Sequence, residues 1–225
     1  DKSDEELISV LNNFKDTIEK IKELGVIVEE VEFPLNLLEA IYPTYMAISC
    51  AEATSNNSNL TGIQFGPRPI ADSIDDIMFK ARTEGFSELI KRRFVLGSYI
   101  LQKENQEKLY LNACRVRRMI TDKMNEIFRT YDALIMPASG GVAPDFIASS
   151  DKLSDKYLIL ENHMAIGNFG GYPSITIPSG MVNNMPVAIN ITGRVREDDV
   201  VLNIANKIEE KIDFKSYGKV MKCIK

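Results

Sequence analysis

The chain has 225 residues, enough to bury a core in one or two domains and too many for a small scaffold held by disulfides. Hydrophobic residues make up 44% and charged residues 26%, the balance of a globular protein. The formal net charge of −5 argues against a surface that clamps nucleic acid by charge. Cys50, Cys114 and Cys223 lie far apart with no CxxC pair, which indicates neither a disulfide framework nor a zinc site and favours a reducing compartment.

The histidine content and the hydropathy exclude further classes of function. His163 is the single histidine, which disfavours both a histidine-rich metal site and a Ser-His-Asp triad. No apolar run approaches the roughly 20 residues that span a bilayer, and no signal-peptide pattern opens the chain. We therefore expect a cytoplasmic protein that does not act on a membrane. Because the first residue is Asp1 rather than Met, we also expect a piece of a longer protein.

The first elements in chain order are a helix and a strand. Apolar residues recur at three- and four-residue spacing over residues 5–24, which predicts an amphipathic helix. Ser3 and Glu6 have the spacing of a capping box at its start, and Gly25 is expected to end it. The segment 26–33 (VIVEEVEF), which Pro34 follows, predicts a strand.

Helices dominate the middle of the chain. We predict them at residues 37–54, 74–82, 86–101 and about 109–127, with a loop rich in glycine, proline and asparagine over 55–69. The last third alternates strands and helices. Strands are predicted at 133–136 (buried on both faces), 174–178 and 187–192, and helices at 157–170 and 198–210. No composition shift divides the chain, so we expect residues 1–225 to belong to one layered α/β domain with no internal boundary.

Arg93 is the first residue that breaks the hydrophobic pattern. On the helix predicted at 86–101 it lies near the centre of the apolar arc, with Leu89 and Leu96 beside it and Gly97 one turn on. A guanidinium group keeps its charge, so it must meet a carboxylate when it is buried. That carboxylate belongs either to the protein, in a structural ion pair, or to a ligand. An arginine that extends its head group to solvent is the third reading.

Glu161 is the second such residue. It lies in the predicted helix 157–170, which has hardly any polar face, and Ala165 and Asn168 follow on the same side. It either caps a neighbouring loop or faces a ligand. Arg93 and Glu161 could pair with each other, or they could bind the carboxylate and the ammonium group of an amino acid. His163 is offset from that side, and we expect a hydrogen-bonded residue at the core or its rim rather than a catalyst.

Several strings of residues, in this order, carry a resemblance to a known family. They are Ala51–Asn56 (AEATSN), Glu84–Phe86 (EGF), Lys91–Gly97 (KRRFVLG), Tyr131–Pro137 (YDALIMP), Asn168–Pro178 (NFGGYPSITIP) and Met185–Asn190 (MPVAIN). Together they resemble the C-terminal half of the A subunits of aspartyl/glutamyl-tRNA(Asn/Gln) amidotransferases, a branch of the amidase signature family. The resemblance extends from the first helix to about residue 210.

The resemblance implies a fold and an activity. The fold is a layered α/β/α arrangement around a mixed sheet, of which this chain is the C-terminal part. The A subunit hydrolyses glutamine and passes the ammonia to the B subunit, which uses ATP and magnesium to convert Glu-tRNA(Gln) or Asp-tRNA(Asn) to Gln-tRNA(Gln) or Asn-tRNA(Asn). The implied assembly is a heterotrimer with B and C subunits that serves protein biosynthesis. The B subunit binds most of the tRNA, and this chain itself needs no cofactor or metal.

The resemblance also implies three substrate-binding residues. The family lines its pocket with a tyrosine, an arginine and an acid, at places that match Tyr45, Arg93 and Glu161. Tyr45 and Arg93 match the family by residue type. The family more usually has aspartate at the third place, so Glu161 is a longer acid than its counterpart.

The catalytic residues implied by the resemblance are absent from the sequence. The family uses two serines and a lysine from a Gly/Ser-rich N-terminal half, and these 225 residues contain no such segment. Ala138–Gly141 has a different spacing, and we expect a loop beside the pocket there. The chain alone is then expected to be inactive and to self-associate through exposed strand edges.

Two alternatives to this assignment stay open. One is another small-amide hydrolase of the amidase signature family, and the other is a non-catalytic interaction module of the same fold. The basic residues Arg115, Arg117 and Arg118 offer no independent support for tRNA contact, because a solvated helix face is their default interpretation.

Overall fold

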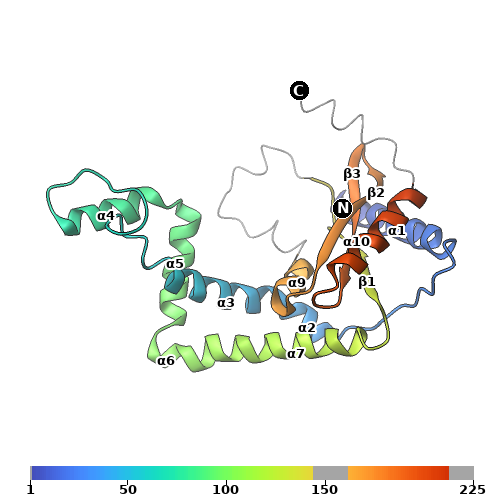
Figure 1. Cartoon of the computed structure of the whole chain (residues 1–225), viewed down its shortest axis with the longest axis horizontal. Helices are drawn as coiled ribbons and strands as arrows, with labels where there is room; N and C mark the ends of the chain where they lie inside the picture. Colours follow the sequence, from blue (N-terminus) through green and yellow to red (C-terminus); the bar gives the residue numbers. More distant parts are fainter. Residues whose placement is uncertain (1, 144–161, 213–225) are drawn as a thin grey trace. The chain divides into compact units, whose positions relative to one another are not determined.

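The computed structural model describes residues 2–143 and 162–212, which are coloured in Figure 1. The chain divides into two compact units. The sheet unit consists of Asp1–Leu38 with Met119–Lys225, and the helical unit of Glu39–Arg118. That both units belong to one amidase domain stays a prediction.

Three antiparallel strands form the sheet of the sheet unit, in the order β1-β3-β2. They are β1 (Ala133–Pro137), β2 (Ser174–Val182) and β3 (Met185–Gly193). Asn183 and Asn184 join β2 to β3 with positive φ angles of 51° and 61°, the backbone of a type I′ hairpin turn, in which asparagine is favoured. The described residues therefore contribute an antiparallel sheet, and no mixed sheet is formed within them.

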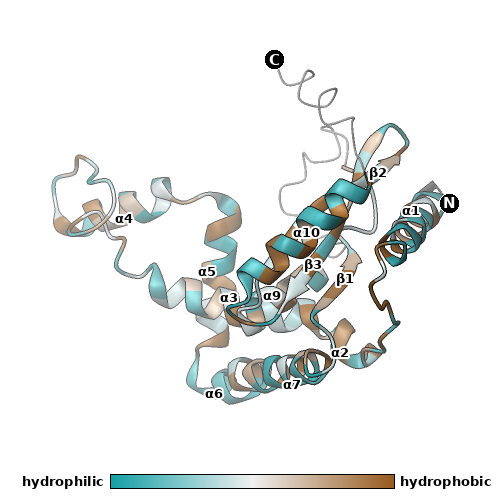
Figure 2. Ribbon diagram, turned by 45° about the vertical axis from the view of Figure 1, so that its right-hand side comes forward, coloured by the Kyte–Doolittle hydropathy of each residue, from teal (hydrophilic) through white to brown (hydrophobic). Residues whose placement is uncertain are grey.

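Two helices cover one face of this sheet. They are α1 (Lys2–Lys22) and α10 (Asp198–Ile212), and both contact β2 and β3. Their apolar stripes and the strands form a core whose buried members are Ile21, Ile177, Ile189, Ile191, Val201, Ala205 and Ile208. In Figure 2 the ribbon of α10 alternates between teal (hydrophilic) and brown (hydrophobic) residues, as expected for an amphipathic helix. The prediction of both helices is confirmed, although α1 begins at Lys2, so Ser3 lies inside the helix and is not its cap.

Two strand predictions need correction. Residues 26–33 pair with no described strand, and Ile27 is 86% exposed. A segment of this kind becomes a strand only where a neighbouring strand pairs with its backbone, and within 26–33 only Val28 packs against the core. The strand β1 exists, but all five of its residues are half-buried rather than buried on both faces. It pairs only with β3 and so lies at one edge of the described sheet.

A buried polar network links β2 to β3. Asn190 is 2% exposed, and its amide donates to Ser174 Oγ at 2.8 Å and to Thr176 Oγ1 at 3.1 Å. Its Oδ1 accepts from Thr192 Oγ1 at 3.0 Å. These bonds satisfy an amide that would otherwise be costly to bury, and they fix the register of the two strands. Beside the sheet, the short helix α9 (Ala165–Gly170) follows a 3₁₀ turn at Asn162–Met164 and ends at Gly171, whose φ is +70°.

The predicted helices of the middle region are confirmed, with different bounds. They are α2 (Leu35–Glu39), α3 (Ile41–Asn56), α4 (Ile74–Gly85), α5 (Glu88–Ile100) and α7 (Asn112–Ile127). Between α5 and α7 lie the short helix α6 (Lys103–Gln106), which was not predicted, and a π-helical turn at Glu107–Leu111. The helix predicted at 37–54 is divided at Ala40. Serine caps begin α4 and α5: Ser73 Oγ accepts from the Asp76 backbone N–H, and Ser87 Oγ accepts from that of Ile90.

Candidate functional site

The helices α3 and α5, which carry Tyr45 and Arg93, pack closely against each other in the helical unit. Gly97 makes this approach possible. A Cβ atom at this position would collide with the carbonyl oxygen of Cys50 and with Oγ1 of Thr54. The contact faces are apolar, since Cys50, Ala51 and Ile100 are buried. Because residue 97 has no side chain, the backbone of α5 packs directly against the backbone of α3 at this point.

A hydroxyl group adds a polar contact to this packing. Thr54 Oγ1 lies 2.8 Å from the carbonyl oxygen of Cys50 in its own helix and 3.3 Å from that of Phe94 in α5. One hydroxyl proton serves both acceptors, so the threonine links the two helix backbones. Gly97 and Thr54 thus bring the backbones of α5 and α3 together at this point.

Arg93 lies one helical turn before Gly97 and a further turn before Ile100, so all three share the stripe of α5 that faces α3. The arginine is half-buried, whereas Gly97 and Ile100 are buried. Among residues 2–143 and 162–212, the side chain of Arg93 makes no hydrogen bond or ion pair. The structure therefore does not provide the structural ion pair that the sequence left open, within that part of the chain.

Tyr45 lies on α3, in the same unit as Arg93, and is half-buried. Its side chain makes no hydrogen bond within the described residues. Glu161 lies outside the described residues, so the proposed trio of Tyr45, Arg93 and Glu161 stays a prediction. What the structure does establish is that the first two residues occupy helices that pack together.

Arg82 is a residue of this unit that no sequence pattern singled out. Its Nη1 atom donates to the carbonyl oxygen of Asn57 at 2.8 Å and to that of Leu60 at 3.3 Å. The same guanidinium group lies over the rings of Phe86 and Phe94. The i,i+4 spacing of Arg82 and Phe86 was the one available signal, and it is too common to identify a site by itself.

In the sheet unit, the loop after β1 is held by two side chains. Val142 N–H donates to Glu6 Oε1 in α1 at 2.9 Å, and His163 Nε2 lies 2.8 Å from the carbonyl oxygen of Pro137. His163 is half-buried and hydrogen-bonded, which confirms its predicted structural role. Ser139 Oγ accepts a hydrogen bond from Gly141 N–H at 3.4 Å within the turn. The Ala138–Gly141 segment is therefore a loop stabilised by local hydrogen bonds.

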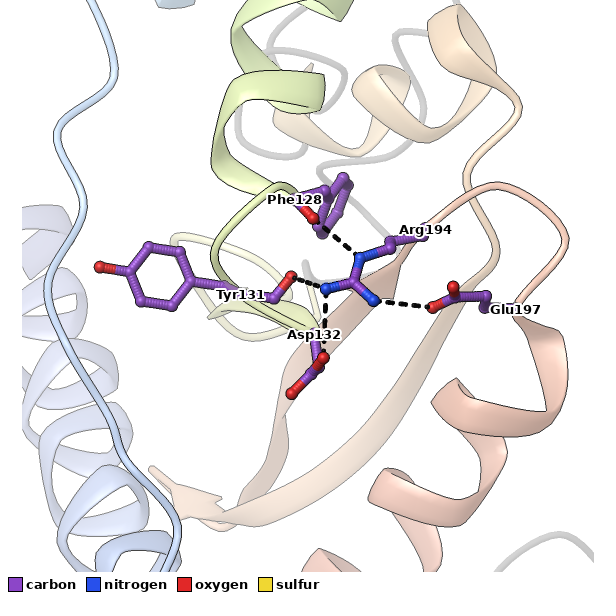
Figure 3. Close-up of polar contacts among 5 residues, drawn as sticks. All are labelled: Phe128, Tyr131, Asp132, Arg194 and Glu197. Atoms are coloured by element: carbon purple, nitrogen blue, oxygen red, sulfur yellow. Dashed lines mark hydrogen bonds and ion pairs between the residues drawn. The ribbon is translucent and has the colours of Figure 1, made fainter.

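Arg194 is the centre of a second polar cluster, at the point where α7 leads into β1 (Figure 3). Its Nε donates to the carbonyl oxygen of Phe128 at 2.8 Å, and its Nη2 donates to the carbonyl oxygen of Tyr131 and to Asp132 Oδ1, each at 3.1 Å. Its Nη1 lies 3.6 Å from Glu197 Oε2. A cation that binds the last carbonyl groups of a helix stabilises its C-terminus, so this cluster joins the end of α7 to the end of β3.

Burial raises the pKa of Tyr110, with further contributions from Cys114 and from Glu52, whose Oε1 accepts a hydrogen bond from the phenol at 3.3 Å.

No group of three or more metal-ligating side chains occurs in the part of the chain that the structure describes. Among the basic residues of α7, Arg115 pairs with Glu107 at 2.7 Å, as expected for a solvated face. No described helix is long and apolar enough to cross a membrane.

The chain is similar to the A subunits of glutamyl-tRNA(Gln) amidotransferases. The A subunit of the glutamyl-tRNA(Gln) amidotransferase of Ruthia magnifica subsp. Calyptogena magnifica is 32% identical over 206 residues, which cover 91% of this chain and 42% of that protein. Its namesake from Thermotoga maritima is 31% identical over 209 residues, covering 93% and 43%. The chain thus spans about two-fifths of the length of these relatives.

Solved structures agree with the fold. The crystal structure of the A subunit from Thermotoga maritima is 29% identical and superposes with a TM-score of 0.64 over 90% of this chain and 38% of its own. A bacterial aryl acylamidase of the amidase signature family superposes with a TM-score of 0.69 at 16% identity, over 93% of this chain and 41% of its own, which supports the fold alone. The amidase-signature-like α/β fold and the resemblance predicted from the sequence are therefore confirmed. A profile of the Amidase family matches residues 4–202, and the chain belongs to the amidase family.

Proposed function

We propose that this chain is the substrate-recognition part of the glutamine-hydrolysing subunit of a tRNA-dependent amidotransferase. The observation that carries the proposal is Arg93: a half-buried guanidinium group without an ion pair in the described residues, on a helix that packs against the helix of Tyr45. Identity of 31–32% to the A subunits of glutamyl-tRNA(Gln) amidotransferases, over more than nine-tenths of the chain, supports the same assignment.

The chemistry of the proposed site is the binding of an amino acid by its two charged ends. Arg93 takes the α-carboxylate of glutamine in a bidentate pair, Tyr45 adds a hydroxyl group, and Glu161 takes the α-ammonium group. This clamp directs the side-chain amide toward a serine nucleophile that these 225 residues do not supply. Positioning of this kind lowers a barrier but makes no bond, so the chain alone is expected to be inactive.

The proposed partners follow from the same relationship. The B and C subunits complete a heterotrimer, the B subunit binds most of the tRNA and uses ATP and magnesium, and the assembly works in the cytoplasm. The product is Gln-tRNA(Gln) or Asn-tRNA(Asn). Without the rest of the amidase domain the chain is expected to self-associate, because β1 and β2 are edge strands of the described sheet and Leu7, Ile8 and Leu11 of α1 are exposed.

The experiment that tests this function separates it from a general small-amide hydrolase. The chain is fused behind the part of the Thermotoga maritima relative that precedes the matched region, and hydrolysis of glutamine and of a neutral aliphatic amide is measured. Arg93→Met is expected to reduce kcat/KM for glutamine by about a hundredfold, the value of a charge-assisted bidentate contact, and to spare the neutral amide. Arg68→Met, which removes an exposed charge from the same unit, is the matched control.

The outcomes are distinct. If Arg93→Met reduces kcat/KM equally for both substrates, the general amide hydrolase is favoured, because the arginine then does not bind the α-carboxylate. A fusion that folds but neither binds nor hydrolyses glutamine would instead favour the non-catalytic module, and titration calorimetry with glutamine measures the binding directly.

A further inference from the structure

Arg82 connects three segments of the helical unit. It projects from α4 and donates to the carbonyl oxygen of Asn57 at 2.8 Å and of Leu60 at 3.3 Å. Asn57 is the C-cap residue that follows α3, and the last carbonyl groups of a helix lack partners within it. A fixed cation there satisfies such a group and offsets the negative end of the helix dipole. Arg82 therefore fixes α4 to the C-terminal end of α3.

The same guanidinium group also contacts α5. Its central carbon lies 5.0 Å from the centroid of the Phe86 ring and 5.2 Å from that of the Phe94 ring. The two rings meet edge to face, with centroids 4.9 Å apart and an interplanar angle of 86°. Cations attract aromatic rings at this distance, and arginine does so while its N–H groups still donate in the plane. One side chain therefore holds the end of α3 and the Phe94 side of α5 together.

Arg93 immediately precedes Phe94 on α5. Neighbouring residues of a helix lie about 100° apart around its axis, so fixing the direction of Phe94 also fixes the direction of Arg93. Gly97 sets the distance between α5 and α3, and Thr54 holds the backbone carbonyl group of Phe94, whereas Arg82 contacts the ring of Phe94. Loss of Arg82 removes the restraint on the side chain that adjoins the proposed carboxylate-binding group.

We infer that Arg82 is a positioning residue for Arg93: by joining the end of α3 to the Phe86–Phe94 pair, it orients the guanidinium group that binds the α-carboxylate. This inference rests on the proposed function. Lysine cannot replace Arg82, because an ammonium group has no planar face and cannot lie over the two rings while it donates to both carbonyl groups.

Two measurements test the inference. In the chain itself, amide hydrogen exchange is followed in α5 for Arg82→Met, Arg82→Lys and the control Arg68→Met. We expect faster exchange around Phe94 in both Arg82 variants and no change in the control. In the fusion with the Thermotoga maritima segment, both Arg82 variants are expected to raise KM for glutamine about tenfold, with kcat within about threefold and the neutral amide unaffected.

The results separate this inference from the proposed function. The role of Arg82 would be overturned if hydrogen exchange in α5 is unchanged in the Arg82 variants. It would also be overturned if these variants lose kcat/KM equally for glutamine and for the neutral amide, even where Arg93→Met behaves as proposed. An Arg93→Met variant with normal glutamine kinetics would overturn the proposed function, and with it the substrate role of Arg82. If Arg82→Met does not fold, the same exchange and kinetic measurements are made on Arg82→Lys, which keeps the positive charge.

Discussion

Gly97 in α5 lies directly against the backbone of Cys50 in α3, with no room between them for a methyl group. The atoms in the way include backbone atoms of Cys50, which cannot rotate aside as a flexible side chain could. This one contact sets the separation of the two helices that carry Tyr45 and Arg93.

We predict that Gly97→Ala destabilises the protein by about 1–3 kcal/mol, because overpacking of a closed interface outweighs the better helix propensity of alanine. Urea unfolding followed by circular dichroism measures the change. Gly85→Ala is the matched control, since a Cβ atom at the end of α4 meets nothing within 4 Å. Equal stability of the two variants would contradict the close packing.

Asn190 gives a second prediction, in the sheet unit. Replacement by alanine leaves the hydroxyl groups of Ser174, Thr176 and Thr192 without their common partner, so we expect a loss of about 1–3 kcal/mol. Chemical denaturation measures this loss. Asn206→Ala removes an exposed amide of α10 that donates to Glu210, and it should change the stability by less than about 0.5 kcal/mol.

The contacts of Arg194 give a third prediction. Arg194→Met removes its bonds to the carbonyl groups of Phe128 and Tyr131, and we expect a loss of about 1–2 kcal/mol, mostly from these carbonyl groups, because the ion pairs of a partly exposed arginine contribute little. Thermal unfolding in low and in high salt separates the two contributions. Arg129→Met, an exposed neighbour, should leave the melting temperature unchanged, and a salt-dependent loss in Arg194→Met would assign the effect to the ion pairs instead.

Glu23 and Lys211 provide a prediction about pH. Their side chains meet at 2.7 Å, and the hydrogen bond from Lys211, followed by its charge, lowers the pKa of Glu23. A lowered pKa means that the unfolded state binds the proton more tightly, so this stabilisation is present above the ordinary glutamate pKa of about 4.3 and is lost as pH falls through the lowered value. Lys211→Met should therefore be less stable than the parent at about pH 7, with a difference that shrinks toward about pH 3. A difference independent of pH would exclude the ion pair as its source.

A fifth prediction concerns self-association. β1 and β2 lie at the edges of the described sheet, and Leu7, Ile8 and Leu11 of α1 are exposed. We expect the weight-average mass to rise with concentration in sedimentation equilibrium. Replacing Ile8 with lysine should weaken this association without unfolding α1, because the residue already faces solvent. A monomer at all concentrations would contradict the expectation.

The sequence by itself determined the helices, because their apolar residues recur every three or four positions and this local period is enough to define α1, α4, α5 and α10. It also placed Arg93 on the apolar side of α5 and identified the family. Tertiary structure alone decided that residues 26–33 form no strand in the described sheet, since a strand needs a partner that periodicity does not reveal. It likewise decided that Arg82 meets Asn57 and Phe94. These partners are distant in the chain, and no local pattern encodes a hydrogen bond or a ring contact whose two ends are brought together only by the packing of different helices.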